Sequence, residues 1–260
     1  MMFTTGIVSV TFRQKSMGEI IALCRQTGLD SIEVGSDVHA PKDDLTNCRA
    51  IADEAKAAGI TVASYGSYYK LGQYPDAAAE FTAYIDAAKA LGAPNIRIWA
   101  GVKNSQDVDE AKRAELVREA QLCADLASKA GLTMSFEYHG GTLTNESDSA
   151  VRLMREINRE NVHLYWQPNQ YHDLEFNLTS LRAALPYVSN VHVFAWDARS
   201  GTNIRYPLID HANAWGQYLD ILAADGRNHA LLMEFVKDDA DEHFLADAAV
   251  LKEWSNKYAL

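Results

Sequence analysis

Cysteine is scarce in this sequence, and its three copies form no motif. Cys24, Cys48 and Cys123 lie far apart, each inside a helical pattern. Three isolated thiols provide neither a disulfide framework nor a Cys-x-x-Cys zinc site. We therefore expect buried free thiols in a reducing compartment, which predicts a cytoplasmic protein.

Long apolar runs and a basic leader are also missing. No stretch approaches the ~18 consecutive apolar residues that a membrane-spanning helix needs. Residues 1–12 carry no basic cluster ahead of an apolar segment and run directly into a strand pattern. We expect neither a signal peptide nor a membrane segment.

Positive charge is in short supply. The chain has 24 Lys and Arg residues against 35 Asp and Glu, a formal net charge of -11. Proteins that bind nucleic acids or anionic membranes use clustered Lys and Arg. The composition therefore argues against both kinds of partner and favours a small molecule.

A strand–loop–helix unit recurs along the chain. Helical patterns end in glycine, as at Gly28, Gly59, Gly92 and Gly131, and a short apolar run follows. Glycine is favoured just past a helix end, and such runs are typical of strands buried in a parallel sheet. Eight strands are predicted, at residues 6–12, 31–34, 60–63, 96–99, 132–136, 162–166, 188–195 and 230–233. Eight units in 260 residues predict an α/β fold, a single (β/α)8 TIM barrel domain over residues 1–260.

Polar residues interrupt four consecutive predicted strands near their carboxyl ends, where barrel enzymes place their chemistry. They are Glu137, Gln167, His192 and Glu234. Taken singly, a strand-end Glu is more often a salt-bridge partner, and a His between two valines a core residue. Together they favour a shared divalent-metal site, since a cation relieves the cost of burying converging carboxylates.

The chain resembles the sugar phosphate isomerase/epimerase family, the xylose isomerase-like TIM barrels, over essentially its whole length. The matching features are residues 28–34, residues 96–101, Glu137 with His139, residues 191–193, and Glu234. The resemblance implies one divalent ion (Mn, Mg, Co or Zn) held by Glu, Asp, His and Glu. Here Gln167 stands in the Asp position and Gln170 replaces the His of the family's Asp-x-x-His pair. The site would then contain two carboxylates instead of three.

The resemblance also implies a reaction. The expected substrate is a small sugar whose neighbouring carbonyl and hydroxyl groups bind the metal, with proton abstraction giving a metal-stabilised enediolate. Glu137 and Glu234 match the two family carboxylates that move the proton, so we predict that they are catalytic as well as metal ligands.

Five further residues are predicted to contact substrate: His139, Arg199, Glu33, Trp99 and Tyr65. Each has a structural alternative. His139 could cap a helix, Arg199 could be a surface residue, and Glu33 could form a structural ion pair. Trp99 and Tyr65 could pack in the core.

The predicted function is a metal-dependent sugar isomerase or epimerase. A metal-dependent lyase or dehydratase on a keto-sugar or cyclitol would begin with the same proton abstraction. A non-catalytic sugar-binding barrel is a third alternative, because both family positions carry Gln. An abasic-site endonuclease would need more His ligands and a more basic surface. A homodimer is expected because dimers are common among the relatives.

Overall fold

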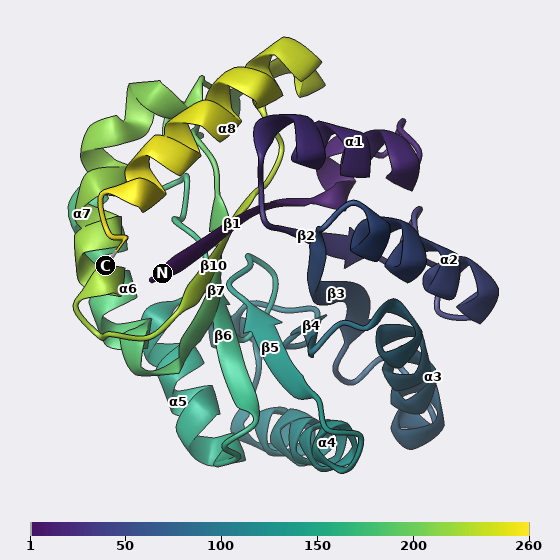
Figure 1. The fold of residues 1–260 in the computed structure, drawn as a ribbon. Helices are drawn as coiled ribbons and strands as arrows, with labels where there is room; N and C mark the ends of the chain where they lie inside the picture. Colours follow the sequence, from purple (N-terminus) through teal and green to yellow (C-terminus); the bar gives the residue numbers. More distant parts are fainter. Residues whose placement is uncertain (1, 260) are drawn as a thin grey trace.

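The structure, a computed structural model, describes residues 2–259. Parallel strands form a central barrel, and helices surround it (Figure 1). The barrel strands are β1 (Phe3–Val8), β2 (Ser31–Gly35), β3 (Thr61–Lys70), β4 (Asn95–Trp99), β5 (Thr133–Glu137), β6 (Val162–Trp166), β7 (Val188–Val193) and β10 (His229–Met233). They close in the order β1-β10-β7-β6-β5-β4-β3-β2, which confirms the predicted TIM barrel.

One α-helix follows each barrel strand, and some of the connections also contain short 3-10 turns. The helices are α1 (Met17–Thr27), α2 (Leu45–Ala57), α3 (Ala77–Leu91), α4 (Glu110–Lys129), α5 (Ser147–Ile157), α6 (Leu174–Ala184), α7 (Ala212–Ala223) and α8 (Asp241–Asn256). α1 and α3 end at Gly28 and Gly92, whose φ angles of 68° and 69° lie in the left-handed region. A side chain would strain that conformation, which explains the glycines seen in the sequence.

The first strand differs from its prediction. It runs over Phe3–Val8 rather than residues 6–12, and Ser9–Phe12 form a 3-10 turn. Phe3 already pairs with His229 of β10, so strand pairing begins before the first residue of the predicted strand, Gly6. Ser9 ends it, since its hydroxyl accepts a hydrogen bond from the backbone N–H of Gly35 (2.9 Å).

Side chains alternate between the inside of the barrel and the helical layer because successive strand residues point to opposite faces. On β5, Met134 and Phe136 belong to the main apolar core between strands and helices. Ser135 and Glu137 lie on the opposite face, and the Ser135 hydroxyl donates to Asn95 of β4 (2.8 Å). The barrel interior therefore contains polar side chains. Those at the carboxyl ends of the strands form the candidate site.

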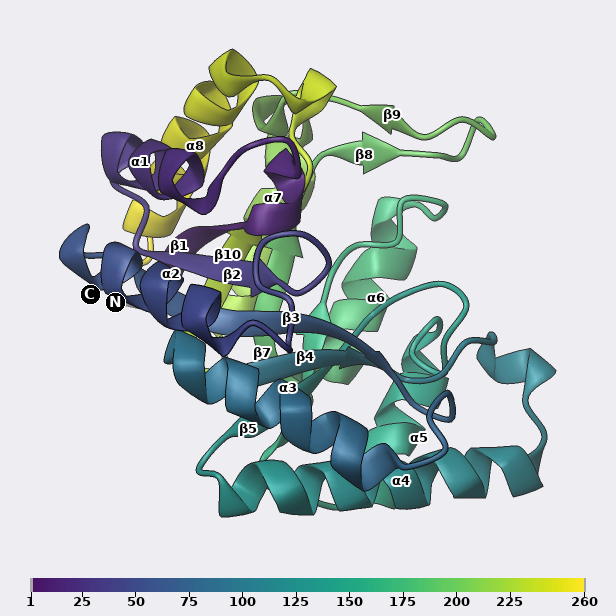
Figure 2. The same ribbon diagram turned by 90° about the vertical axis from the view of Figure 1, so that its right-hand side faces the viewer.

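The two ends of the barrel differ. Both termini lie at one end, and the antiparallel hairpin of β8 (Trp196–Asp197) and β9 (Ile204–Arg205) projects from the other (Figure 2). The long strand-to-helix loops gather at the hairpin end.

The three cysteines are buried and free. Among residues 2–259, no helix combines the length and apolar character that crossing a bilayer requires.

Candidate metal centre

Three predicted metal ligands meet at the hairpin end of the barrel. Glu137 ends β5, His192 lies on β7, and Glu234 follows β10. One ligand atom from each lies within 4.8 Å of the others, and all three residues are buried. Nδ1 of His192 is 3.6 Å from Oε1 of Glu137 and 3.5 Å from Oε2 of Glu234. Two carboxylate oxygens and an imidazole nitrogen in this arrangement suit a divalent ion.

Gln167, the fourth predicted ligand, joins the same cluster. Its Oε1 lies 2.8 Å from Nδ1 of His192 and can accept a hydrogen bond when that nitrogen carries the proton. An amide oxygen is also an acceptable ligand for a hard cation, although it brings no charge. The structure therefore brings together all four residues predicted from the strand ends.

Arg97 was not predicted to belong to the site, yet it is the cation of this cluster. It is almost fully buried on β4, where its Nε donates to Oε1 of Glu33 (2.7 Å) and its NH1 to Oε2 of Glu137. The sequence does contain a signal for Arg97, since a charged residue stands between the apolar residues Ile96 and Ile98 of a predicted strand. Burial alone would lower the pKa of Arg97, but the charges of Glu137 and Glu33 raise it well above its ordinary value.

Glu33 lies beneath the ligands rather than in the open cavity. It is fully buried, and its Oε2 is 3.6 Å from Nε2 of His192. Neither of those two atoms has a hydrogen-bond partner among residues 2–259. Burial alone would raise the pKa of Glu33, but Arg97 and His192 lower it to about 2. Glu33 thus forms an ion pair, the alternative considered for it, and stays ionised below the metal ligands.

The pKa values of Glu234 and His192 are raised, opposite to that of Glu33. Burial raises the pKa of Glu234, and the charge of Glu137 adds to that effect while His192 opposes it. Burial would lower the pKa of His192, but Glu234 and Glu33 raise it above its ordinary value. Converging carboxylates thus favour positive charge among them, whether a proton or a cation.

Trp99 and His139 flank Glu137. The indole Nε1 of Trp99 donates to Oε2 of Glu137 (2.5 Å), and its ring stacks on His139 with centroids 4.4 Å apart. Nδ1 of His139 is 2.6 Å from the backbone oxygen of Gly140. Trp99 therefore orients a metal ligand, while His139 presents its ring to the cavity wall.

The remaining two predicted substrate residues lie elsewhere. Tyr65 is fully buried, and its hydroxyl donates to the backbone oxygen of Ala40 (2.7 Å). The exposed Arg199 pairs with Asp197 (2.5 Å) and lines a neighbouring depression instead of the cavity at the ligands. The placement of both matches the structural alternatives considered for them.

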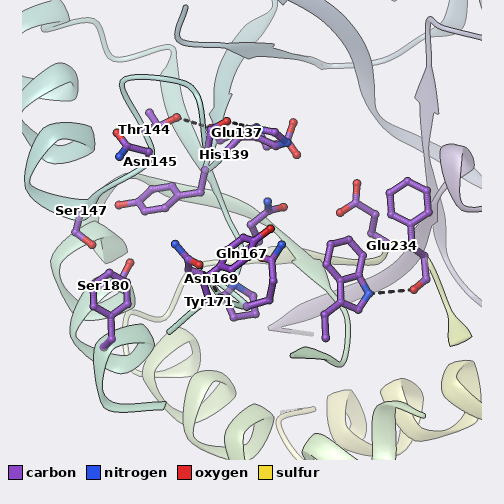
Figure 3. A pocket seen from close by; sticks show the side chains of 17 residues that line it. Glu137, His139, Thr144, Asn145, Ser147, Gln167, Asn169, Tyr171, Ser180 and Glu234 are labelled. Carbon is purple, nitrogen blue, oxygen red and sulfur yellow. Dashed lines mark hydrogen bonds between the residues drawn. The ribbon is translucent and has the colours of Figure 1, made fainter. Parts of the chain in front are cut away.

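A cavity of about 460 Å³ opens from the ligands toward α5 and α6. Glu234 lies at one end, and Ser147 and Ser180 lie at the other, with Gln167 and Asn169 between them (Figure 3). Sequence reasoning missed Ser147 and Ser180, because small hydroxyl residues at helix positions carry no distinctive signal. The volume of this cavity is toward the lower end of the range for small-molecule pockets, and it is large enough for a monosaccharide.

Similar structures share this fold over nearly the whole chain. A probable 3-DHS dehydratase, AsbF from Bacillus anthracis, is 18% identical, with 96% of this chain and 98% of that chain covered and a TM-score of 0.78. D-allulose 3-epimerase from Methylomonas sp. is 17% identical, with 99% and 98% covered and a TM-score of 0.72. A xylose isomerase-like TIM barrel protein from Mycobacterium smegmatis, in complex with magnesium, is 13% identical, with 98% and 97% covered and a TM-score of 0.72.

Identities this low show the shared fold alone. No curated protein sequence matches the chain significantly. Residues 21–254, however, match the family described as Xylose isomerase-like TIM barrel. That match spans most of the chain and includes every residue of the candidate metal centre. The chain therefore belongs to the xylose isomerase-like TIM barrel family.

Proposed function

We propose that this protein is a divalent-metal-dependent isomerase or epimerase of a small sugar. One observation carries the proposal: Glu137, His192 and Glu234 converge within 4.8 Å at the strand ends, beside a cavity of about 460 Å³. Structural neighbours include an epimerase and a magnesium complex, which supports the same chemistry.

The donor set fits a divalent ion on physical grounds. Three buried carboxylates, of Glu33, Glu137 and Glu234, share a single permanent cation, Arg97, among the residues that the structure describes. Leaving such charges uncompensated in the interior costs several kcal/mol. An ion at the four donor atoms, including Oε1 of Gln167, would offset this cost. When bound, it would polarise a substrate carbonyl and make the adjacent C–H more acidic.

Glu137 and Glu234 have different surroundings, which suggests different roles. Oε2 of Glu137 accepts from both Arg97 and Trp99, so this carboxylate is fixed in place. Among residues 2–259, no comparable pair of donors contacts Glu234, and burial raises its pKa. A raised pKa suits a group that takes and returns a proton near neutral pH. Glu234 would therefore accept the proton from the carbon next to the carbonyl.

Glu137 would handle the proton on the opposite face of the substrate carbon. Its free Oε1 faces Nδ1 of His192 at 3.6 Å and so points into the ligand cluster. Two carboxylates on opposite faces allow a proton to leave from one side and return from the other, which is an epimerisation. Return to the neighbouring carbon would instead give an isomerisation.

The test is exchange of substrate hydrogen with solvent. The Mn²⁺-loaded protein is incubated with ketopentoses and ketohexoses in D₂O, and NMR follows deuterium incorporation and product formation. Glu137→Gln and Glu234→Gln should each lower the exchange rate by about 100-fold or more. Glu253→Gln, on the exposed face of α8, is the matched control and should change nothing.

Three outcomes contradict the proposal. Near wild-type exchange in both variants would remove the carboxylates from the mechanism. Loss of water from the sugar would assign a lyase. Sugar binding without any exchange would assign a binding protein.

A further inference from the structure

The far end of the cavity, opposite Glu234, is built of hydroxyl groups. Tyr138, Ser147 and Ser180 line it together with Thr144 and other polar residues. Ser147 and Ser180 lie on the same side of the cavity in Figure 3, away from Glu234. We call the site formed by Tyr138, Ser147 and Ser180 the hydroxyl subsite.

Tyr138 gives the strongest indication that this end binds something. Its side chain is 7% exposed, and its hydroxyl has no hydrogen-bond partner among the described residues. The phenol O–H of Tyr138 has a proton to donate. A buried donor without a partner is costly, and a ligand that orders the neighbouring serine hydroxyls would supply Tyr138 with an acceptor.

The two serines provide the direct contact surface. Ser180 is 6% exposed, and its Oγ accepts from Nε1 of Trp166 (3.3 Å), so its own proton is free to be donated. Ser147 is the first residue of α5 and is partly exposed in the cavity wall. The Tyr138 oxygen is itself covered, so a ligand meets Ser147 and Ser180 first. Tyr138 then donates to whichever serine oxygen the ligand leaves free.

The charge around this subsite excludes an anionic group. No Lys or Arg is among the cavity-lining residues in the described part of the chain. The N-terminal end of α5 would favour an anion, but Glu146 and Asp148 already place negative charge there and act on Tyr138.

Three cations lie over the aromatic rings of Phe235 or Trp99, and each already has a partner. Arg13 pairs with Asp37 (2.6 Å), and Arg205 pairs with Asp239 (2.6 Å). Nζ of Lys70 lies over the ring of Trp99, 4.5 Å from its centroid. None of the three is a lining residue of the cavity.

We propose that the hydroxyl subsite binds the uncharged, hydroxyl-bearing end of the substrate, so that the substrate is a free sugar or cyclitol and carries neither phosphate nor carboxylate. This inference rests on the proposed function, which places the carbonyl end at the metal ligands. The hydroxyl subsite then selects substrates by their length and by their charge. It accepts hydroxyl groups and repels anions.

Binding to the full-length, Mn²⁺-loaded protein tests this directly. Calorimetry compares matched pairs of probes, D-fructose with D-fructose 6-phosphate and myo-inositol with its monophosphate. The neutral member of each pair should bind at least about tenfold more tightly, because no Lys or Arg lines the hydroxyl subsite in the described part of the chain to pair with the phosphate. Equal or tighter binding of the phosphates would overturn the inference.

Substitutions in the hydroxyl subsite test whether its residues cause this preference for neutral probes. Ser147→Ala and Ser180→Ala should each weaken neutral-probe binding by about fivefold to tenfold, as expected for one lost hydrogen bond. Tyr138→Phe should have a smaller effect because it acts through the serines. Ser128→Ala, on an exposed position of α4, is the control. Unchanged binding in all three cavity variants, each with a wild-type melting temperature, would contradict the proposal.

The outcomes separate this inference from the proposed function. Tight neutral-probe binding that depends on Ser147 and Ser180, without any solvent exchange of hydrogen, would retain the subsite and reject the isomerase. Exchange on phosphorylated sugars alone would retain the isomerase and reject the subsite.

Discussion

At the scale of single residues, Gln167 shapes the metal centre most. Its amide oxygen lies 2.8 Å from Nδ1 of His192, in the position that family resemblance assigns to an Asp. Arg97 further reduces the negative charge by pairing with Glu137. The site therefore attracts a cation less strongly than a three-carboxylate site would, and a bound ion would be more Lewis-acidic.

Restoring the carboxylate should strengthen metal binding. Gln167→Asp adds a negative charge next to Nδ1 of His192, and we expect Mn²⁺ to bind at least about tenfold more tightly. Calorimetric titration at a fixed pH measures the dissociation constant. Gln26→Asp adds the same charge at an exposed position of α1 and serves as the control. A dissociation constant unchanged by Gln167→Asp would remove residue 167 from the ligand set.

A second residue-scale feature is the buried carboxylate of Asp247 on α8. It is 5% exposed and accepts a hydrogen bond from the backbone N–H of Leu208 (2.8 Å). Burial raises the pKa of Asp247 to about 6, although the Leu208 hydrogen bond opposes this shift. The unfolded chain then loses this proton at lower pH than the folded protein. Asp247 therefore reduces stability as pH rises from about 4 to 6.

Asp247→Asn should remove that pH dependence. The amide keeps an acceptor for Leu208 and carries no charge to bury. We expect the variant to match the wild type near pH 4 and to exceed it at pH 7 by about 1 to 3 kcal/mol in free energy of unfolding. Urea denaturation across this pH range measures the difference. A difference that stays constant with pH would show that Asp247 does not titrate in this window.

At the scale of elements, α1 has the best-defined start. The Ser16 hydroxyl accepts from the backbone N–H of Glu19 (3.3 Å), and the Glu19 carboxylate accepts from the backbone N–H of Ser16 (2.8 Å). This reciprocal pair is a capping box, and it satisfies two donors that the helix leaves unpaired. It also determines where the chain leaves the 3-10 turn after β1.

Loss of this cap should destabilise the protein modestly. Ser16→Ala removes the side-chain acceptor, and we expect the free energy of unfolding to fall by about 1 kcal/mol. Ser16→Thr retains a hydroxyl and is the matched control. Urea midpoints of the three proteins give the comparison. Equal losses in both variants would mean that the cap does not contribute through its hydrogen bond.

At the scale of the whole molecule, barrel closure assembles the metal centre from strands far apart in sequence. Pairing of β1 with β10 closes the barrel, and pairing of β10 with β7 sets Leu232 beside His192. Because the ligands come together only in the folded barrel, a bound ion stabilises the folded state alone.

Metal addition should therefore raise the melting temperature. At an Mn²⁺ concentration 100 times the dissociation constant, the stabilisation is about 2.7 kcal/mol, which corresponds to roughly 5–10 °C. Differential scanning fluorimetry with and without chelator measures it. His192→Ala should abolish the shift, while His243→Ala, a partly exposed control on α8, should retain it. No shift with Mn, Mg, Co or Zn would favour a metal-free sugar-binding barrel.

The sequence by itself determined the barrel and the ligand positions, because both depend on local patterns. Glycine just past several of the helices, apolar runs of strand length, and polar residues at the ends of those runs are visible in the linear order. Glu137, Gln167, His192 and Glu234 were found this way, since equivalent strand ends of a barrel meet at one mouth.

Only the tertiary structure decided which groups act on those ligands. Arg97 joins Glu33 to Glu137 across three strands, and Tyr138, Ser147 and Ser180 line one cavity from separate elements. Such contacts depend on register and on the inward or outward direction of each side chain, and no local pattern encodes either for a single polar residue. The four candidate ligand positions could be predicted from the sequence, and their role as metal ligands stays a prediction, whereas their charge balance and the hydroxyl subsite required the closed barrel.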